Sequence, residues 1–131
     1  IAAAGGDVRG KTIGILGVAF KPNTDDMRDA PSLTIIPVLQ QAGAKVKAYD
    51  PEAIETAKPL IDGVEWSNDS YAAVKDSDIL VILTEWNEFR ALDLKRVYND
   101  MSGNIIVDLR NIYKASEVND LGFHYSSIGR E

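Results

Sequence analysis

The chain has 131 residues, of which 45% are hydrophobic and 26% are charged, and its formal net charge is −6. This length and composition predict one globular domain with a hydrophobic core. The acidic balance argues against broad nucleic-acid binding, because an acidic surface repels a phosphate backbone. The sequence contains no cysteine, which excludes disulfides, zinc–thiolate sites and cysteine nucleophiles from this chain.

We recognise no targeting signal in the sequence. No apolar run approaches the ~20 residues of a membrane span, and the opening stretch IAAAGGDVRG lacks the basic start of a signal peptide. We therefore expect a cytoplasmic location, with which the lack of cysteine agrees. The chain begins with Ile rather than Met, so we expect residues 1–10 to be the end of a preceding helix and a linker, and residues 11–131 to form the domain.

Strand-like and helix-like segments alternate from residue 11 onward. Residues 11–18 are a short apolar run that contains glycine near its end, which is typical of a buried strand entering a turn. Residues 32–44 have a helical pattern that Gly43 closes, with Pro37 inside it. The next elements expected are a strand at 45–51 and a short helix at 52–60.

The second half of the chain continues the alternation. Asp69 is the expected N-cap of a helix at 69–77, and the most apolar run, 78–84, is the best candidate for a central parallel strand. This pattern predicts a Rossmann-like, doubly wound α/β fold: a mostly parallel sheet of about six strands with helices on both faces. The other elements expected are strands at 64–67, 104–110 and 123–129, and helices at 92–101 and 116–122, the last with a serine cap and a glycine stop.

Basic residues follow two of the expected strands. Ligands of open α/β sheets bind beyond the carboxyl ends of the strands, where Lys21 and Arg110 are expected to face one anion such as a phosphate. The competing interpretations are a solvated loop lysine and a local ion pair between Arg110 and Asp108. Phe20 either stacks on a planar base or closes the turn as a core aromatic.

The run TDDMRD, residues 24–29, places carboxylates around one arginine. One interpretation is a self-contained network in which Asp29 caps the following helix. The other gives Arg28 an external anion and lets Asp25 and Asp26 brace the loop. We discount a Mg²⁺ site on this pair, because a basic residue lies two positions away and no third ligand is evident.

The dinucleotide fingerprint is incomplete. Gly14 and Gly17 are not followed by a third glycine, so this turn is not expected to hold a pyrophosphate on a helix N-terminus. Asp50 lies where dinucleotide-binding folds hold a ribose, but the adjacent Pro51 also fits a simple turn.

Two further features have structural interpretations. His124 lies in a strand with no neighbouring acid in sequence, and we interpret it as structural. Residues 84–90, TEWNEFR, are expected to form a packed loop in which Trp86 covers the sheet edge.

Four blocks of the sequence, GVAFKPNTDDMRDAPS, YDPEA, VILTEWNEFRALD and VDLRNIY, resemble a known family in order and spacing. They are similar to the C-terminal, UDP-binding domain of the UDP-glucose/GDP-mannose dehydrogenases, and most of all to its UDP-glucose 6-dehydrogenases. The resemblance runs from Lys11 to Arg130. It implies an enzyme of polysaccharide biosynthesis that uses NAD to oxidise UDP-glucose to UDP-glucuronate through a cysteine-bound intermediate.

The resemblance also implies roles for individual residues. Phe20, Lys21 and Arg110 match family residues that contact the UDP-sugar, and Arg28 matches an arginine that reaches across a cleft to NAD. The catalytic cysteine and the NAD-binding domain belong to other parts of such an enzyme, so this chain has no catalytic or metal-binding residue and is not competent alone. The implied partners are UDP-glucose or UDP, the rest of the same polypeptide, and further copies in a homodimer or larger assembly.

Two alternatives stay open at this point. One is the same domain of a GDP-mannose or UDP-N-acetyl-mannosamine dehydrogenase. The other is a non-enzymatic, receiver-like signalling domain, which requires acidic residues directly after the first strand and a lysine late in the chain. Here the acids come several residues after that strand, and Arg110 stands where the lysine is required.

Overall fold

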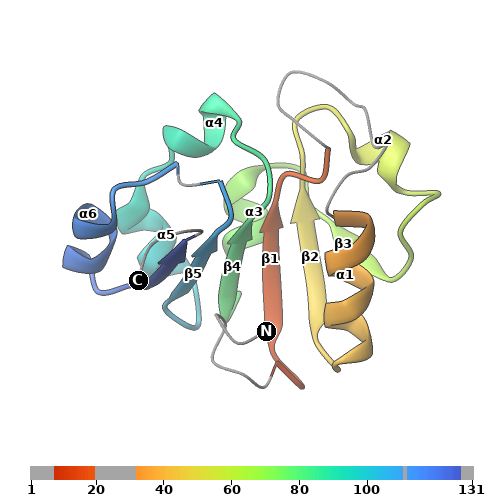
Figure 1. Ribbon diagram of the computed structural model, residues 1–131, viewed down its shortest axis with the longest axis horizontal. Helices are drawn as coiled ribbons and strands as arrows, with labels where there is room; N and C mark the ends of the chain where they lie inside the picture. Colours follow the sequence, from red (N-terminus) through yellow and green to blue (C-terminus); the bar gives the residue numbers. More distant parts are fainter. Residues whose placement is uncertain (1–7, 20–31, 111, 128–131) are drawn as a thin grey trace.

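A single parallel sheet organises the chain, for which a computed structural model describes residues 8–19, 32–110 and 112–127. The strands lie in the order β3-β2-β1-β4-β5-β6 (Figure 1), and every neighbouring pair is parallel. This is the strand order of doubly wound dinucleotide-binding folds, and it confirms the predicted fold. The strands are β1 (Thr12–Leu16), β2 (Lys45–Tyr49), β3 (Val64–Trp66), β4 (Ile79–Ile82), β5 (Ile105–Asp108) and β6 (His124–Ser127).

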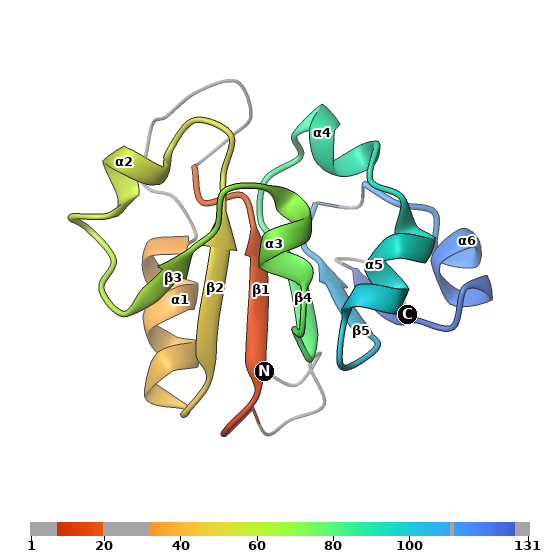
Figure 2. The same cartoon turned by 180° about the vertical axis from the view of Figure 1, so that it is seen from behind.

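Helices cover both faces of this sheet. Figure 1 shows α1 in front of β2 and β3, and Figure 2 shows α3 and α5 on the opposite face. Within the described residues, none of the helices is long and apolar enough to cross a bilayer. The helices are α1 (Ser32–Gln41), α2 (Ile54–Ala57), α3 (Ser70–Val74), α4 (Asn87–Arg90), α5 (Leu94–Asp100) and α6 (Ala115–Asp120).

The core consists of two clusters, one on each face of the sheet. Ile79 and Val81 of β4 pack on the α1 side, whereas Leu80 and Ile82 pack on the α3 and α5 side. A central strand buried on both faces needs a continuous apolar run rather than an alternating one, which explains the sequence ILVI. Val8, which precedes β1, is also buried in the cluster on the α1 side.

The ends of the helices test the predicted caps. The side chain of Asp69 accepts a hydrogen bond from the backbone N–H of Ala72 at 2.7 Å, as predicted for an N-cap. The serine cap predicted for the last helix is wrong: α6 starts one residue earlier, after Lys114, and Ser116 lies within its first turn. Gly122 ends this helix with a φ of +105°, which favours glycine.

The segment 84–90 differs from the predicted loop. It contains α4, a helix of 4 residues. Trp86 is the N-cap of α4 and Phe89 lies within this helix, and both are buried with Ile82 in one core cluster. Trp86 is therefore a core residue of this face and does not cover the sheet edge.

The turn after β1 depends on the absence of a side chain at Gly17. Gly17 has a φ of +90°, and a Cβ atom there would lie 2.5 Å from the Cβ of Thr84. Gly10 has a φ of +76° but no atom within 4 Å of such a Cβ.

We predict that Gly17→Ala lowers the free energy of unfolding by about 3 kcal/mol or more, from backbone strain plus overpacking, measured by urea denaturation.

The matched control is Gly10→Ala, which carries the backbone strain without the steric clash. We expect it to cost about 1–2 kcal/mol. Equal losses for the two variants would contradict the role given to the contact between Gly17 and Thr84.

Candidate functional site

The turn that follows β1 is held by its neighbours on both sides. The backbone N–H groups of Val18 and Ala19 donate to Asp50 Oδ2 at 2.9 and 3.1 Å. The carbonyl of Ala19 accepts from Thr84 Oγ1 at 2.8 Å, and the carbonyl of Val18 accepts from Ser32 Oγ at 2.6 Å. These hydrogen bonds therefore fix the positions of Ala19 and Ser32 at this rim.

Asp50 uses its second carboxylate oxygen for the turn after β2. Oδ1 accepts from the N–H groups of Glu52 and Ala53, both at 2.8 Å, and the residue is 2% exposed. A buried carboxylate requires such partners, because charge-assisted hydrogen bonds offset its loss of hydration. The ribose-binding interpretation is thus wrong for Asp50, and the turn interpretation is correct but too narrow, because Asp50 also holds the β1 turn.

Asp108 has the corresponding place at the end of β5. Its Oδ1 accepts from the N–H of Arg110 at 3.0 Å. Its Oδ2 accepts from the N–H groups of Ile112 and Tyr113 at 2.8 and 3.2 Å and from the hydroxyl of Tyr125 at 2.6 Å. Asp108 is fully buried, so its carboxylate stabilises the turn after β5 and ties it to β6.

Arg110 lies at this rim, as the sequence predicts. Its Nε donates to the carbonyl of Leu83 at 2.8 Å and lies 3.5 Å from Glu85 Oε2, and the two side chains are 29% and 30% exposed. Glu85 is thus an ion-pair partner of Arg110, whereas the side chain of Asp108, the partner that the alternative interpretation predicts, receives backbone and tyrosine donors.

Glu85 as the partner of Arg110 is not predicted from the sequence. In the structure, Ile82 of β4 pairs with Asp108 of β5, so the residues just beyond these two positions lie side by side. Glu85 and Arg110 each follow one of these strands within three residues. Register between parallel strands cannot be read from one sequence, so the sequence does not reveal this partner.

A second polar bridge crosses the rim from β2 to α4. Burial, together with the nearby Glu88 carboxylate, raises the pKa of Tyr49 to about 12. Ser70 Oγ also donates to Glu88 Oε1, at 3.2 Å. The rings of Tyr49 and Phe89 also make an edge-to-face contact, with centroids 6.3 Å apart, so the end of β2 packs against α4.

The other predicted site residues, Phe20, Lys21 and Arg28, lie outside the described residues, as do Asp25, Asp26 and Asp29. What the structure does fix is the position of Ala19 and Ser32, the described residues on either side of this segment. In the described part of the chain, no group of three or more His, Cys, Asp or Glu side chains could hold a metal ion. The N–H groups of Val18 and Ala19 serve Asp50, so this turn does not offer them to the pyrophosphate of a dinucleotide.

Comparison of the sequence with known proteins identifies the family to which this domain belongs. Residues 14–115 match the model of the UDP-glucose/GDP-mannose dehydrogenase family, UDP binding domain. The chain belongs to this family. The match includes Arg110 and both buried aspartates, and it leaves no support for the receiver-like alternative.

Curated relatives in the family are much longer than this chain. It is 56% identical over 130 residues to a UDP-glucose 6-dehydrogenase of Rhizobium meliloti (strain 1021), covering 99% of this chain and 30% of that protein. It is 48% identical over 126 residues to the UDP-glucose 6-dehydrogenase TuaD of Bacillus subtilis (strain 168), covering 95% of this chain and 27% of that protein. The chain thus spans less than a third of the length of these relatives.

Solved structures of related dehydrogenases share the fold. A UDP-glucose dehydrogenase from Pyrobaculum islandicum aligns with a TM-score of 0.74 at 34% identity, over 88% of this chain and 27% of that one. An NDP-N-acetyl-D-galactosaminuronic acid dehydrogenase from Methanosarcina mazei Go1 aligns with a TM-score of 0.85 at 30% identity, over 99% of this chain and 27% of that one.

We expect the Asp50 carboxylate to make a large contribution to the stability of the domain. Asp50→Asn keeps the shape but replaces one acceptor oxygen with an N–H₂ donor that faces backbone N–H groups. We predict a loss of about 3 kcal/mol in the free energy of unfolding, because at least one pair of buried donors loses its partner, measured by urea denaturation. Glu55→Gln, an exposed change on α2, is the control and is expected to stay within about 0.5 kcal/mol. A similar small effect of Asp50→Asn would contradict this account.

Proposed function

We propose that this chain is the UDP-sugar-binding domain of an NAD-dependent UDP-glucose 6-dehydrogenase, an enzyme that oxidises UDP-glucose to UDP-glucuronate. The observation that supports this most strongly is Arg110 at the carboxyl rim of the sheet, held by Leu83 and Glu85, within a chain of this family. We propose that the chain contributes binding and no catalytic residue, and that the rest of a longer polypeptide contributes the NAD site and the catalytic cysteine.

Arg110 has the chemistry required for a diphosphate. A guanidinium carries five N–H donors in a planar fork, so it can contact Glu85 through Nε and serve phosphate oxygens as well. Because the contact to Leu83 fixes the side chain at Nε, Arg110 loses little conformational entropy when the phosphate binds. Glu85 also limits the local positive charge, which favours a single phosphorylated ligand over extended polyanions.

The loop between Ala19 and Ser32 is proposed to complete the site. Phe20 and Lys21 follow the fixed Ala19 directly, and we assign them to the UDP part of the ligand, Phe20 by stacking and Lys21 by charge. Arg28 lies further along this loop, and we assign it to the NAD held by another domain. The tied turn at the end of β1 supports this proposal, since it gives both groups a rigid starting point.

The proposed role in the reaction is positioning. Interactions with the nucleotide, remote from the reacting carbon, help to hold C6 of the sugar against the groups that oxidise it. Closure of two domains around the substrate would also exclude water from a reactive intermediate. We further propose a homodimer or larger assembly, a cytoplasmic location and a role in polysaccharide biosynthesis for the whole enzyme.

UDP-glucose is the proposed substrate because of the names and sequence identities of the relatives. Curated relatives that are 56% and 48% identical carry the name UDP-glucose 6-dehydrogenase. Structures named as dehydrogenases of UDP-N-acetyl-mannosamine are 28% and 30% identical. A GDP-mannose or UDP-N-acetyl-mannosamine enzyme is therefore the second choice, and turnover of the full-length enzyme on each nucleotide sugar decides between them.

Calorimetric titration of UDP into this chain tests the binding role. We expect weak binding, because the chain is proposed to form one wall of the cleft, and we expect Arg110→Ala to weaken it about tenfold or more. Arg96→Ala is the matched control, since Arg96 lies over the ring of Tyr71, 3.8 Å from its centroid. Sub-micromolar UDP binding, or equal effects of the two variants, would argue against the proposal.

Arg28→Ala in the full-length dehydrogenase tests the assignment to NAD. Loss of one cation near a phosphate is expected to raise the KM for NAD about tenfold or more, with a much smaller change in the affinity for UDP. Steady-state kinetics with each substrate varied, together with UDP calorimetry, gives both values. The opposite pattern would assign Arg28 to the nucleotide sugar.

A further inference from the structure

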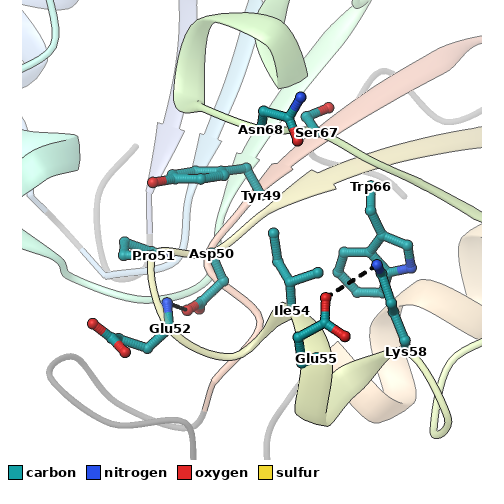
Figure 3. A pocket seen from close by; sticks show the side chains of 10 residues that line it. All are labelled: Tyr49, Asp50, Pro51, Glu52, Ile54, Glu55, Lys58, Trp66, Ser67 and Asn68. Carbon is teal, nitrogen blue, oxygen red and sulfur yellow. Dashed lines mark hydrogen bonds and ion pairs between the residues drawn. The ribbon is translucent and has the colours of Figure 1, made fainter.

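A hollow lies at the carboxyl ends of β2 and β3, toward the sheet edge away from β5 and Arg110 (Figure 3). Its volume is about 360 Å³, which lies in the range of small-molecule sites. Its lining includes two aromatic residues, Tyr49 and Trp66, the side chain of Ile54 between them, and the charged residues Glu52, Glu55 and Lys58.

The aromatic wall is anchored in the core. Trp66 is the last residue of β3, is partly buried, and packs against the cluster on the α1 side. Figure 3 shows Trp66 on one side of Ile54 and Tyr49 on the other. A fixed indole beside an aliphatic side chain gives a planar ring a surface on which to stack.

The charges around this hollow do not suit a phosphate. Its lining contains three carboxylates, those of Asp50, Glu52 and Glu55, and one ammonium group, that of Lys58. Lys58 Nζ lies 3.2 Å from Glu55 Oε1 and is therefore paired. The remaining charge is negative, so it repels anions, whereas exposed carboxylate oxygens accept hydrogen bonds from hydroxyl groups.

Glu52, rather than Asp50, is the carboxylate after β2 that can bind ribose hydroxyls. In dinucleotide-binding folds a carboxylate after the second strand holds ribose hydroxyls. Here both oxygens of Asp50 are engaged by backbone N–H groups. Glu52, two residues further on, is exposed and lines the same hollow.

We propose that this hollow binds an uncharged nucleoside, with its base against Trp66 and its ribose hydroxyls donating to Glu52. Arg110, the phosphate-binding residue of the proposed UDP site, lies beyond β1 and β4 from this hollow. The hollow would therefore give the domain a ligand that does not need the contact between Arg110 and a phosphate.

Titration of adenosine into the chain, followed by NMR of the tryptophan indole N–H groups, tests this site. The chain has two tryptophans, and Trp66→Phe assigns their signals. We expect a saturable shift of Trp66 with little change at the buried Trp86, and weaker binding of AMP than of adenosine. Glu52→Gln should weaken adenosine binding about fivefold or more, whereas Glu117→Gln, an exposed change on α6, should leave it unchanged.

Several results would overturn the proposal. These are the absence of a saturable Trp66 shift at millimolar adenosine, tighter binding of AMP, and equal affinities in Glu52→Gln and the parent chain. Binding of lysine amide without binding of adenosine would make the hollow a cation site instead. Arg110→Ala should not change adenosine binding, so failure here is distinguishable from failure of the UDP proposal.

Discussion

Four backbone N–H groups converge on the buried carboxylate of Asp50, two from the turn after β1 and two from the turn after β2. Asp108 repeats this arrangement after β5, with three N–H groups and the Tyr125 hydroxyl. Turns beyond parallel strands carry donors that no strand can satisfy, and buried donors without partners are costly. Each aspartate meets this requirement and at the same time connects two neighbouring strands, so the carboxyl rim is rigid before any ligand arrives.

This rigidity determines what the rim can bind. A dinucleotide-binding turn leaves its N–H groups for a pyrophosphate, whereas here the N–H groups of Val18 and Ala19 are consumed within the protein. Anion binding then has to come from side chains, and Arg110, held at Nε by Leu83, has that position. Membership of the family's UDP binding domain agrees with a rim that binds a nucleotide through cations rather than through a helix N-terminus.

The sequence predicts the sheet well because its central strands β1, β4 and β5 are mostly apolar and helical patterns separate them. The run ILVI at Ile79–Ile82 fits a strand that is buried on both faces. Arg110 at the rim follows from the same reasoning. The roles of Asp50 and Glu85 do not, because each depends on which strands become neighbours and in which register. The start of α6 does not follow from the sequence either, because its N-cap residue, Lys114, makes no side-chain capping hydrogen bond.

Amide hydrogen exchange at Val18 and Ala19 tests the central claim most directly, namely that Asp50 holds the β1 turn. The measurement compares the chain with its Asp50→Asn variant under native conditions, with the amides of β4 as an internal reference for global stability. We predict that Val18 and Ala19 are protected in the chain and lose protection in the variant by a larger factor than β4 does. Equal changes at the turn and in β4, or fast exchange of Val18 and Ala19 in the unaltered chain, would contradict the account.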